Sequence, residues 1–303
     1  MQELKELVKT NNLDKKLMTN FNKALKDDDF KEFIDKLGMT YEELCKYTSI
    51  LEESKEEYCH CKNCKNIMEC KNKVNGYAYL PKVKDNKITF NYQMCRYNKE
   101  MTEKNRYLEN VYTFEEPNEI VKADIKEIYK EDNARLKVIK YILKFIKEYQ
   151  DGKNPKGLYL HGSFGSGKTY LVSAMLNELA KKNIKSAIIF WPEYLRLLKS
   201  SFNNDEYKTN FDLIKTSPIL LIDDIGAENV TPWSRDEILC SILQYRMEEH
   251  LPTFFTSNLD INSLEHHLSI SKDGTEEIKS RRIIERIKQL TCDEELISKN
   301  LRK

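Results

Sequence analysis

The chain lacks any long apolar run. No stretch of it approaches the roughly 18 consecutive apolar residues that a membrane-spanning helix needs, so no membrane span is expected. Its start, Met1–Thr10, is charged and helix-like and lacks the apolar centre of a secretory signal peptide. With neither a membrane span nor an export signal, the expected location is the cytoplasm.

The chain also lacks an excess of charge of either sign. Its 303 residues include 50 Lys and Arg and 49 Asp and Glu, which give a formal net charge of +1. This balance argues against a protein that coats nucleic acid by bulk charge, so any such binding must come from a local patch. Apolar residues make up 40% of the chain, enough for a packed core, and the length fits one large domain or two smaller ones.

Disulfides rarely persist in the cytoplasm, so the eight cysteines predict free thiols or metal ligands. Residues 57–100 hold a Cys-x2-Cys pair and two further cysteines on either side of a predicted hairpin, and four thiolates can close a tetrahedral zinc site. A redox-active Cys-x2-Cys pair is the alternative, disfavoured because the pair does not follow a βαβ pattern. The predicted ligands are Cys61, Cys64, Cys70 and Cys95, with Cys59 or His60 as substitutes.

The N-terminal third predicts a small helical unit followed by this cysteine module. Apolar side chains recur at helical spacing within residues 1–56, and Thr40 with Glu43 forms a capping box for a helix over Tyr41–Glu53. The stretch Ala78–Tyr92 alternates apolar and polar side chains around Asp85-Asn86, which predicts a hairpin. The expected domains are residues 1–100, with a helical part at 1–56 and the zinc module at 57–100, a polar linker at 101–132, and a second domain at 133–303.

Helices alternate with short apolar strands from residue 133 onward. This alternation is typical of an α/β fold, a parallel sheet flanked by helices. One strand, Pro218–Ile222, is apolar throughout, as a central strand of such a sheet should be. The predicted helices are Ala134–Tyr149, Thr169–Lys182, Glu193–Ser201 and Arg235–Glu249, and the predicted strands are Gly157–His161, Ser186–Trp191, Pro218–Ile222 and Thr253–Thr256.

One segment matches the phosphate-binding pattern GxxxxGK[ST] without a mismatch. Glycines let the backbone wrap closely around a phosphate, and the N–H groups of the loop and of the following helix face the anion. Lys168 is expected to reach the β- and γ-phosphates of ATP, and the Thr169 hydroxyl to ligate Mg²⁺. The segment follows a predicted strand and opens a predicted helix, so a glycine-rich turn without a ligand is the weaker interpretation. Its residues are Gly162, Ser163, Phe164, Gly165, Ser166, Gly167, Lys168 and Thr169.

Polar side chains end two of the predicted strands. Asp223 and Asp224 follow an apolar strand, and Asn258 follows Thr253–Thr256. The carboxyl ends of parallel strands are where ligands bind in such sheets. We expect Asp223 to hold Mg²⁺, Asp224 to polarise the attacking water and Asn258 to bond the γ-phosphate or that water. Alone, such residues are more often caps and turns, but beside a phosphate loop the functional interpretation is favoured.

Together these segments resemble the AAA+ ATPases of the DnaC/DnaI helicase-loader group. The phosphate loop, Leu220–Glu228 and Thr256–Asn258 are similar in order and spacing to that group's Walker A, Walker B and sensor 1 motifs. Most AAA+ proteins carry Asp-Glu in Walker B, whereas this chain has Asp223-Asp224, a variant that the group tolerates. The resemblance covers residues 130–303 and implies an AAA+ P-loop ATPase domain.

The resemblance also implies that a neighbouring copy supplies an arginine to the nucleotide. The segment Arg281–Ile287 is similar to the one that does so, with Arg286 as first choice and Arg282 as second; a solvated helix face is the alternative. Arg302 lies where the group can place a sensor-2-like arginine. Because the chain ends at Lys303, we expect the helical lid of many AAA+ proteins to be absent or truncated and hydrolysis by the lone protein to be weak.

The function that the resemblance implies is loading of the replicative helicase during replication initiation or restart. Residues 1–100 would bind a DnaB-type hexamer, and the ATPase domain would associate with its copies and bind single-stranded DNA. DnaI-type loaders are similar in having a helical segment and a small zinc module before the ATPase; their histidine between the third and last cysteines has no counterpart here. Basic and aromatic residues interleave at the candidate DNA contacts, which an ordinary surface loop would also explain: Lys199, Phe202, Tyr207 and Lys208.

Two other functions stay open at this stage. An IstB-type transposition helper ATPase shares the same AAA+ core, but it binds duplex DNA and should not need a four-cysteine module. Alternatively the chain is an adaptor in which ATP is only a structural ligand.

Overall fold

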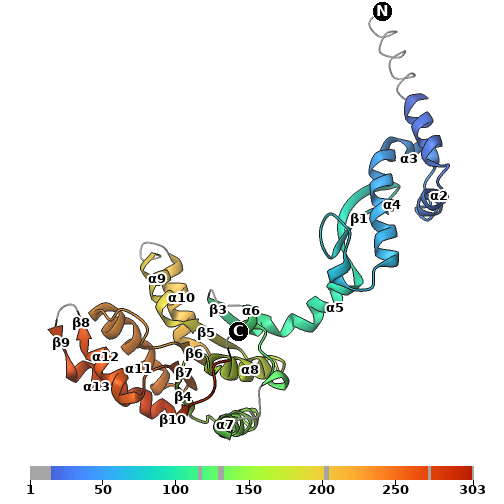
Figure 1. Ribbon diagram of the computed structural model, residues 1–303. Coiled ribbons are helices and arrows are strands. Elements are labelled where there is room, and N and C mark those ends of the chain that lie inside the picture. The colour runs from blue at the N-terminus through green and yellow to red at the C-terminus, as the bar shows by residue number, and fades with distance from the viewer. Residues whose placement is uncertain (1–14, 115–117, 129–132, 201–204, 272–273, 302–303) are drawn as a thin grey trace, which may run out of the picture. The chain divides into compact units, whose positions relative to one another are not determined.

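The computed structural model describes residues 15–114, 118–128, 133–200, 205–271 and 274–301. The chain divides into two compact units, one ending at Arg106 and the other beginning at Tyr107 (Figure 1). Each unit is described by itself.

The first unit combines short helices with one hairpin. Its core gathers the apolar faces of the helices and includes Phe21, Phe30 and Leu51, which are almost completely buried. After a helical segment at residues 15–24, the elements are α2 (Asp28–Asp35), α3 (Tyr41–Leu44), η1 (Cys45–Tyr47), α4 (Thr48–Asn63), η2 (Ile67–Glu69), β1 (Tyr77–Lys84), β2 (Lys87–Met94) and α5 (Arg96–Asn105).

The predicted hairpin and capping box of this unit are confirmed, but the helix predicted after the capping box is interrupted. The hairpin is present: β1 and β2 pair antiparallel, and Asp85 and Asn86 form its turn with φ of +50° and +57°. The Thr40–Glu43 capping box is also present. The single helix predicted over Tyr41–Glu53 is instead broken at η1, where the Thr48 hydroxyl donates to the Cys45 carbonyl at 2.7 Å and replaces a helical partner.

The second unit is built on a parallel sheet with the strand order β10-β4-β7-β6-β5-β3. Helices cover both faces of the sheet (Figure 1). In chain order the elements are η3 (Arg106–Asn110), β3 (Val111–Phe114), α6 (Asn118–Val121), η4 (Ile125–Glu127), α7 (Asn133–Gln150), β4 (Gly157–Gly162), α8 (Lys168–Ala180), β5 (Ser186–Phe190), α9 (Trp191–Ser200), α10 (Asp205–Thr216), β6 (Ile219–Asp223), η5 (Trp233–Leu239), α11 (Cys240–Glu248), β7 (Thr253–Ser257), α12 (Ile261–Ser269), β8 (Ile270–Ser271), β9 (Gly274–Thr275), α13 (Glu277–Leu290) and β10 (Thr291–Leu296).

Alternation along the strands divides the core of this unit into two layers. Leu221 and Phe254 pack on the face covered by α7 and α8, whereas Ile222 and Phe255 pack on the face covered by α11 and α13. Because successive side chains of a strand point to opposite faces, a strand buried on both sides must be apolar throughout. The predicted α/β architecture is therefore confirmed. No helix in the described part of the chain has both the length and the apolar character to cross a membrane.

The stretch 101–132 differs from the linker that the sequence predicts. Its described residues carry the end of α5, η3, β3, α6 and η4, and β3 is an edge strand that pairs with β5 in the sheet of the second unit. Val111 is buried in the core of that unit. A four-residue edge strand gives a weak sequence signal because half of its side chains face solvent, which is why polar composition suggested a connector.

Candidate nucleotide-binding site

The GxxxxGK[ST] segment forms the loop between β4 and α8. Gly162 ends the strand and Lys168 begins the helix, the context that the pattern requires. Two of its glycines are demanded by their surroundings. At Gly162, with φ of +137°, a Cβ would lie 2.2 Å from the Leu296 carbonyl oxygen; at Gly165, with φ of +69°, it would collide with the Asn300 side chain. The loop therefore keeps its shape only with glycine at both positions.

The Lys168 ammonium lies inside this loop and is largely buried. Its Nζ donates to the carbonyl oxygens of Gly162 at 3.1 Å and Ser163 at 2.9 Å, and to Asn258 Oδ1 at 2.9 Å. A buried ammonium with only neutral acceptors among these partners is well suited to meet an incoming anion. The loop N–H groups and the N-terminus of α8 add partial positive charge at the same place.

Asp223, at the end of β6, joins the loop to a neighbouring strand. Its Oδ1 accepts from the Thr169 hydroxyl at 2.6 Å and from the Thr256 hydroxyl of β7 at 2.5 Å. Burial raises the pKa of Asp223 to about 6, and the nearby Asp224 adds to this, while the two hydroxyls and Lys168 oppose it. A carboxylate beside a hydroxyl offers the hard oxygen donors that Mg²⁺ prefers, so the pair fits that ion.

Asp224 and Asn258 complete the constellation. The backbone of Asp224 is left-handed, with φ of +56°, a conformation that aspartate tolerates better than most residues. Its N–H donates to the Thr256 hydroxyl at 3.0 Å, and its Oδ1 accepts from Asn258 Nδ2 at 3.1 Å. One amide therefore links Lys168 to Asp224, and the structure brings together the three segments that the sequence singled out separately.

Two parts of the site were missed by sequence reasoning. Residues after β10 run along the loop: Ser163 Oγ donates to the Ser298 carbonyl at 3.0 Å, and Leu301 N donates to the Gly165 carbonyl at 2.8 Å. On another side, the buried Arg135 of α7 donates to the Ser166 carbonyl. Neither contact has a local sequence pattern, since each joins residues far apart in the chain. Arg302 lies outside the described residues.

The predicted arginines lie on α13. Arg286 is half-buried and its Nη1 lies 2.8 Å from Cys240 Sγ at the start of α11, whereas Arg282 is exposed. The predicted DNA contacts flank the α9–α10 connection: Lys199 lies over the Trp233 ring at 5.4 Å, Tyr207 is half-buried against the core, and Lys208 is exposed. Phe202 lies outside the described residues.

The four cysteines predicted as zinc ligands lie at the ends of three helices of the first unit. Cys61 is in the last turn of α4, Cys64 is the C-cap of that helix, Cys70 is the C-cap of η2, and Cys95 is the N-cap of α5. The pKa of the Cys61 thiol is raised, first by burial and then by the nearby Cys95, Cys70 and Cys64 thiols. Across the described ranges, however, no group of three His, Cys, Asp or Glu side chains is arranged to hold a metal ion. His60, one of the two predicted substitute ligands, has its Nδ1 atom 3.3 Å from Asn72 Oδ1.

Comparison with known proteins decides the family. The chain is 33% identical over 295 residues to the replicative helicase loader DnaI of Bacillus subtilis (strain 168), a match that covers 95% of this chain and 94% of that protein. The chain belongs to the DnaI family. A family model for AFG1-like ATPases matches residues 92–221, and one for the central domain of the helicase HerA matches residues 160–302.

Solved structures agree with this assignment. A crystal structure of DnaI is similar with a TM-score of 0.58 and 45% identity, covering 65% of this chain and all of that one. A putative primosome component from Streptococcus pyogenes serotype M3 is similar with a TM-score of 0.55 and 32% identity, covering 65% of this chain and 97% of that one. The second unit of this DnaI-family member is therefore an α/β P-loop ATPase domain of the AAA+ type, as the sequence predicts.

The raised pKa of Asp223 predicts a pH dependence of stability. Ionisation of this group is harder in the folded chain than in the unfolded one, so stability is lost as pH rises from its ordinary value of 3.8 to about 6. Without nucleotide or Mg²⁺, Asp223→Asn should raise the thermal midpoint at pH 8 by on the order of 5 °C, because Asn cannot ionise. The gain should shrink at pH 4.5. Asp212→Asn, at an exposed position of α10, is the matched control and should change neither midpoint. An equal gain for Asp223→Asn at both pH values would contradict the assignment.

Proposed function

We propose that this protein is an ATP-dependent loader of the replicative DNA helicase. The observation that carries the proposal is the 33% identity to a replicative helicase loader along 95% of the chain, which includes the first unit as well as the ATPase domain. The same length of match disfavours the IstB-type transposition helper, because a shared ATPase core alone would leave the first unit unmatched.

ATP binding rests on the phosphate-loop network. The loop N–H groups and Lys168 would hold the β- and γ-phosphates, and Thr169 with Asp223 would ligate Mg²⁺, which neutralises phosphate charge when bound. Asp224 and Asn258 share a hydrogen bond beyond the carboxyl ends of β6 and β7, which supports a role for the pair in orienting an attacking water. Binding of ATP requires a rearrangement of the Lys168 side chain. Its ammonium must exchange the Gly162 and Ser163 carbonyls and Asn258 Oδ1 for phosphate oxygens.

The first unit is the proposed helicase-binding part, corresponding to the predicted domain at residues 1–100. We expect the full chain to co-migrate with the DnaB-type helicase of its host in size-exclusion chromatography with light scattering, in the presence of ATP and Mg²⁺. A variant lacking residues 1–106 should not co-migrate, because the second unit retains its own core but loses the proposed contact surface.

The matched comparison is Lys168→Ala in the full chain. A complex that still forms with this variant, but no longer places the helicase on DNA, would support a nucleotide-driven switch. Unchanged loading activity would instead favour an adaptor in which ATP is structural. Co-migration of the variant that lacks residues 1–106 would refute the assigned role of the first unit.

Zinc is the proposed structural ligand of the first unit. The thiols of Cys64, Cys70 and Cys95 are near enough to Cys61 to raise its pKa, and the backbone N–H groups of Gly76 and Asn98 donate to the Cys70 and Cys95 sulfurs at 3.4 Å. Four thiolates are a donor set of the kind that Zn²⁺ prefers. The thiols would have to move closer together to bind zinc, because no three such side chains in the described part of the chain are grouped closely enough to hold a metal ion. The ligand set is Cys61, Cys64, Cys70 and Cys95.

Protein purified without chelator should contain about one equivalent of zinc, because structural zinc binds tightly. Elemental analysis by inductively coupled plasma mass spectrometry measures this directly. Cys64→Ser should lower the zinc content and destabilise the first unit, whereas Cys292→Ser, an exposed cysteine of the ATPase domain, should leave it unchanged. Less than about half an equivalent in the unmodified chain would rule out the four-thiolate site.

Self-association of the ATPase domain would bring an arginine of α13 to the nucleotide of a neighbouring copy. Arg286→Ala should lower ATP turnover in the assembled state by at least about 10-fold, since a trans arginine stabilises the transferring phosphoryl group. Cys240→Ala removes the contact between Arg286 and Cys240 but leaves the charge of Arg286 in place, so ATP turnover should be unchanged. If only the exposed Arg282→Ala lowers turnover, the role passes to Arg282.

Single-stranded DNA is the other proposed partner of this domain. Lys199 lies near the end of α9, and Tyr207 and Lys208 lie near the start of α10, so positive charge and an aromatic ring flank the connection between the two helices. This combination suits backbone and base contacts. Equal affinity of the Lys199→Ala, Lys208→Ala double variant and the unmodified chain for a labelled single strand would remove this surface from the proposal.

A further inference from the structure

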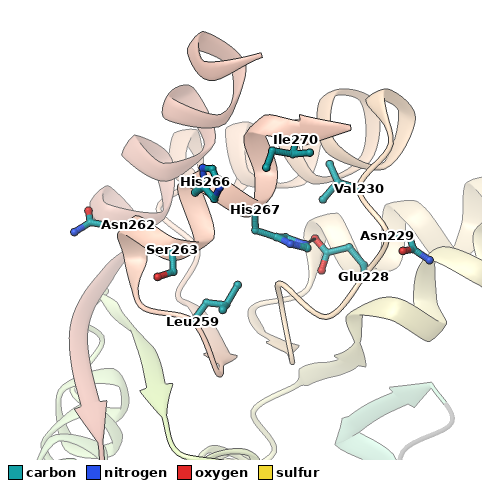
Figure 2. A pocket seen from close by; sticks show the side chains of 9 residues that line it. All are labelled: Glu228, Asn229, Val230, Leu259, Asn262, Ser263, His266, His267 and Ile270. Atoms are coloured by element: carbon teal, nitrogen blue, oxygen red, sulfur yellow. Dashed lines mark ion pairs between the residues drawn. The ribbon is translucent and has the colours of Figure 1, made fainter. Parts of the chain in front are cut away.

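A cavity lies outside the nucleotide site, next to the segments that follow β6 and β7. Its volume is about 900 Å³, and it opens between the loop at Glu228–Val230 and α12 (Figure 2). Leu259, the residue that follows Asn258, forms part of its wall. Nothing in the proposed handling of ATP uses this cavity.

The polar atoms at its floor have unused hydrogen-bonding capacity. Figure 2 shows the Glu228 carboxylate and the His267 ring pointing toward each other. Their closest atoms, Glu228 Oε1 and His267 Nε2, lie 3.9 Å apart, longer than a hydrogen bond. The Nε2 atom is buried without a hydrogen-bond partner among the described residues, whereas Glu228 Oε2 accepts from Gly226 N at 2.7 Å. A polar group entering the cavity could bond both.

The charge of the lining identifies the kind of group that fits. Among the described residues that line the cavity, Glu228 is the only carboxylate and none is lysine or arginine. The Glu228 side chain is almost completely buried, and this burial raises its pKa, so a positive charge nearby would favour its ionised form. A phosphate would be repelled by the same carboxylate.

Three apolar side chains line part of the cavity, and we call them the apolar rim: Val230, Leu259 and Ile270. Ile270 is about half exposed. Besides His267, the remaining uncharged lining residues are polar: Asn229, Asn262, Ser263 and His266. Lysine and arginine side chains combine an aliphatic stem with a cationic head, so they match an apolar rim above a buried carboxylate. A short inorganic cation would leave the rim uncovered.

We propose that this cavity, defined by Glu228, His267 and the apolar rim, binds a lysine or arginine side chain presented by a partner protein. The guanidinium or ammonium head pairs with Glu228 at the floor, and the stem covers Val230, Leu259 and Ile270.

A short backbone segment, residues 224–228, links the cavity to the nucleotide site. The Gly226 N–H donates to the Glu228 carboxylate. Within the same turn, Ala227 N donates to the Asp224 carbonyl at 3.2 Å, and Ile225 N donates to the Thr256 carbonyl at 3.0 Å. Thr256 in turn donates to Asp223. A partner side chain that draws Glu228 toward itself therefore pulls on the turn that carries Asp223 and Asp224.

The test uses arginine amide as probe and its neutral isostere citrulline amide as the matched control. Binding to the full chain at pH 8 is followed through the NMR signals of ¹³C-labelled histidines, a readout independent of ATP turnover. Arginine amide should give a saturable shift of the His267 signal, and Glu228→Gln should weaken this binding by about 10-fold, since one ion pair is lost. Citrulline amide should leave the signal in place.

Two further variants keep the result interpretable. Glu265→Gln, on the same helix but outside the cavity lining, removes an acid of equal charge and should leave arginine amide binding unchanged. Asn262→Asp adds a negative charge at an exposed position of the lining and should tighten binding even if Glu228→Gln fails to fold. Equal shifts with citrulline amide, or an equal effect of Glu265→Gln, would overturn the proposal. So would a His267 shift produced by a single-stranded oligonucleotide in place of arginine amide.

Discussion

The hydrogen bonds that converge on Asp223 Oδ1 hold the ATPase site in one piece. Thr169 comes from the start of α8, Thr256 from β7, and the carboxylate itself from the end of β6. Because the acceptor is almost fully buried, each hydroxyl offsets part of the cost of removing a carboxylate from water. Three elements that are distant in sequence are thereby fixed at the same edge of the sheet, which is where a nucleotide and its metal ion would be bound.

The phosphate loop depends on this network and on supports from two other sides. Residues 296–301 follow β10 and bond Ser163 and Gly165, while Arg135 reaches the Ser166 carbonyl from α7. Carbonyls that are occupied by these donors cannot turn toward an anion, so the loop N–H groups are left to face it. The preorganisation of the loop therefore involves both α7 and the segment that follows β10.

The cavity at Glu228 shares the strands that carry the site. The turn after β6 holds Asp224 and leads to Glu228, and the segment after β7 holds Asn258 and leads to Leu259. In a parallel sheet the loops that leave the carboxyl ends of neighbouring strands lie side by side, so a ligand site and a partner site can share their walls. This proximity offers a physical route by which a bound partner could influence ATP handling in a DnaI-family protein.

The sequence by itself determined what depends on local pattern. The GxxxxGK[ST] spacing placed the loop between a strand and a helix, the Asp85-Asn86 turn defined the hairpin, and the apolar runs located the central strands, because each of these is set by neighbouring residues. The polar ends of β6 and β7 could be expected to meet, since the carboxyl ends of parallel strands lie at one edge. The ligand set of the cysteine module and the arginine of α13 stay predictions.

Only the tertiary structure decided the contacts that join distant segments. The edge strand β3, the last strand β10, the bracing of the loop by residues 296–301 and the approach of His267 to Glu228 have no local signature. Short edge strands bury too little apolar surface to show a period, and a side chain such as Arg135 gives no sign in sequence of the carbonyl it will meet. These features follow from how the sheet packs against its helices, a global property that no window of neighbouring residues contains.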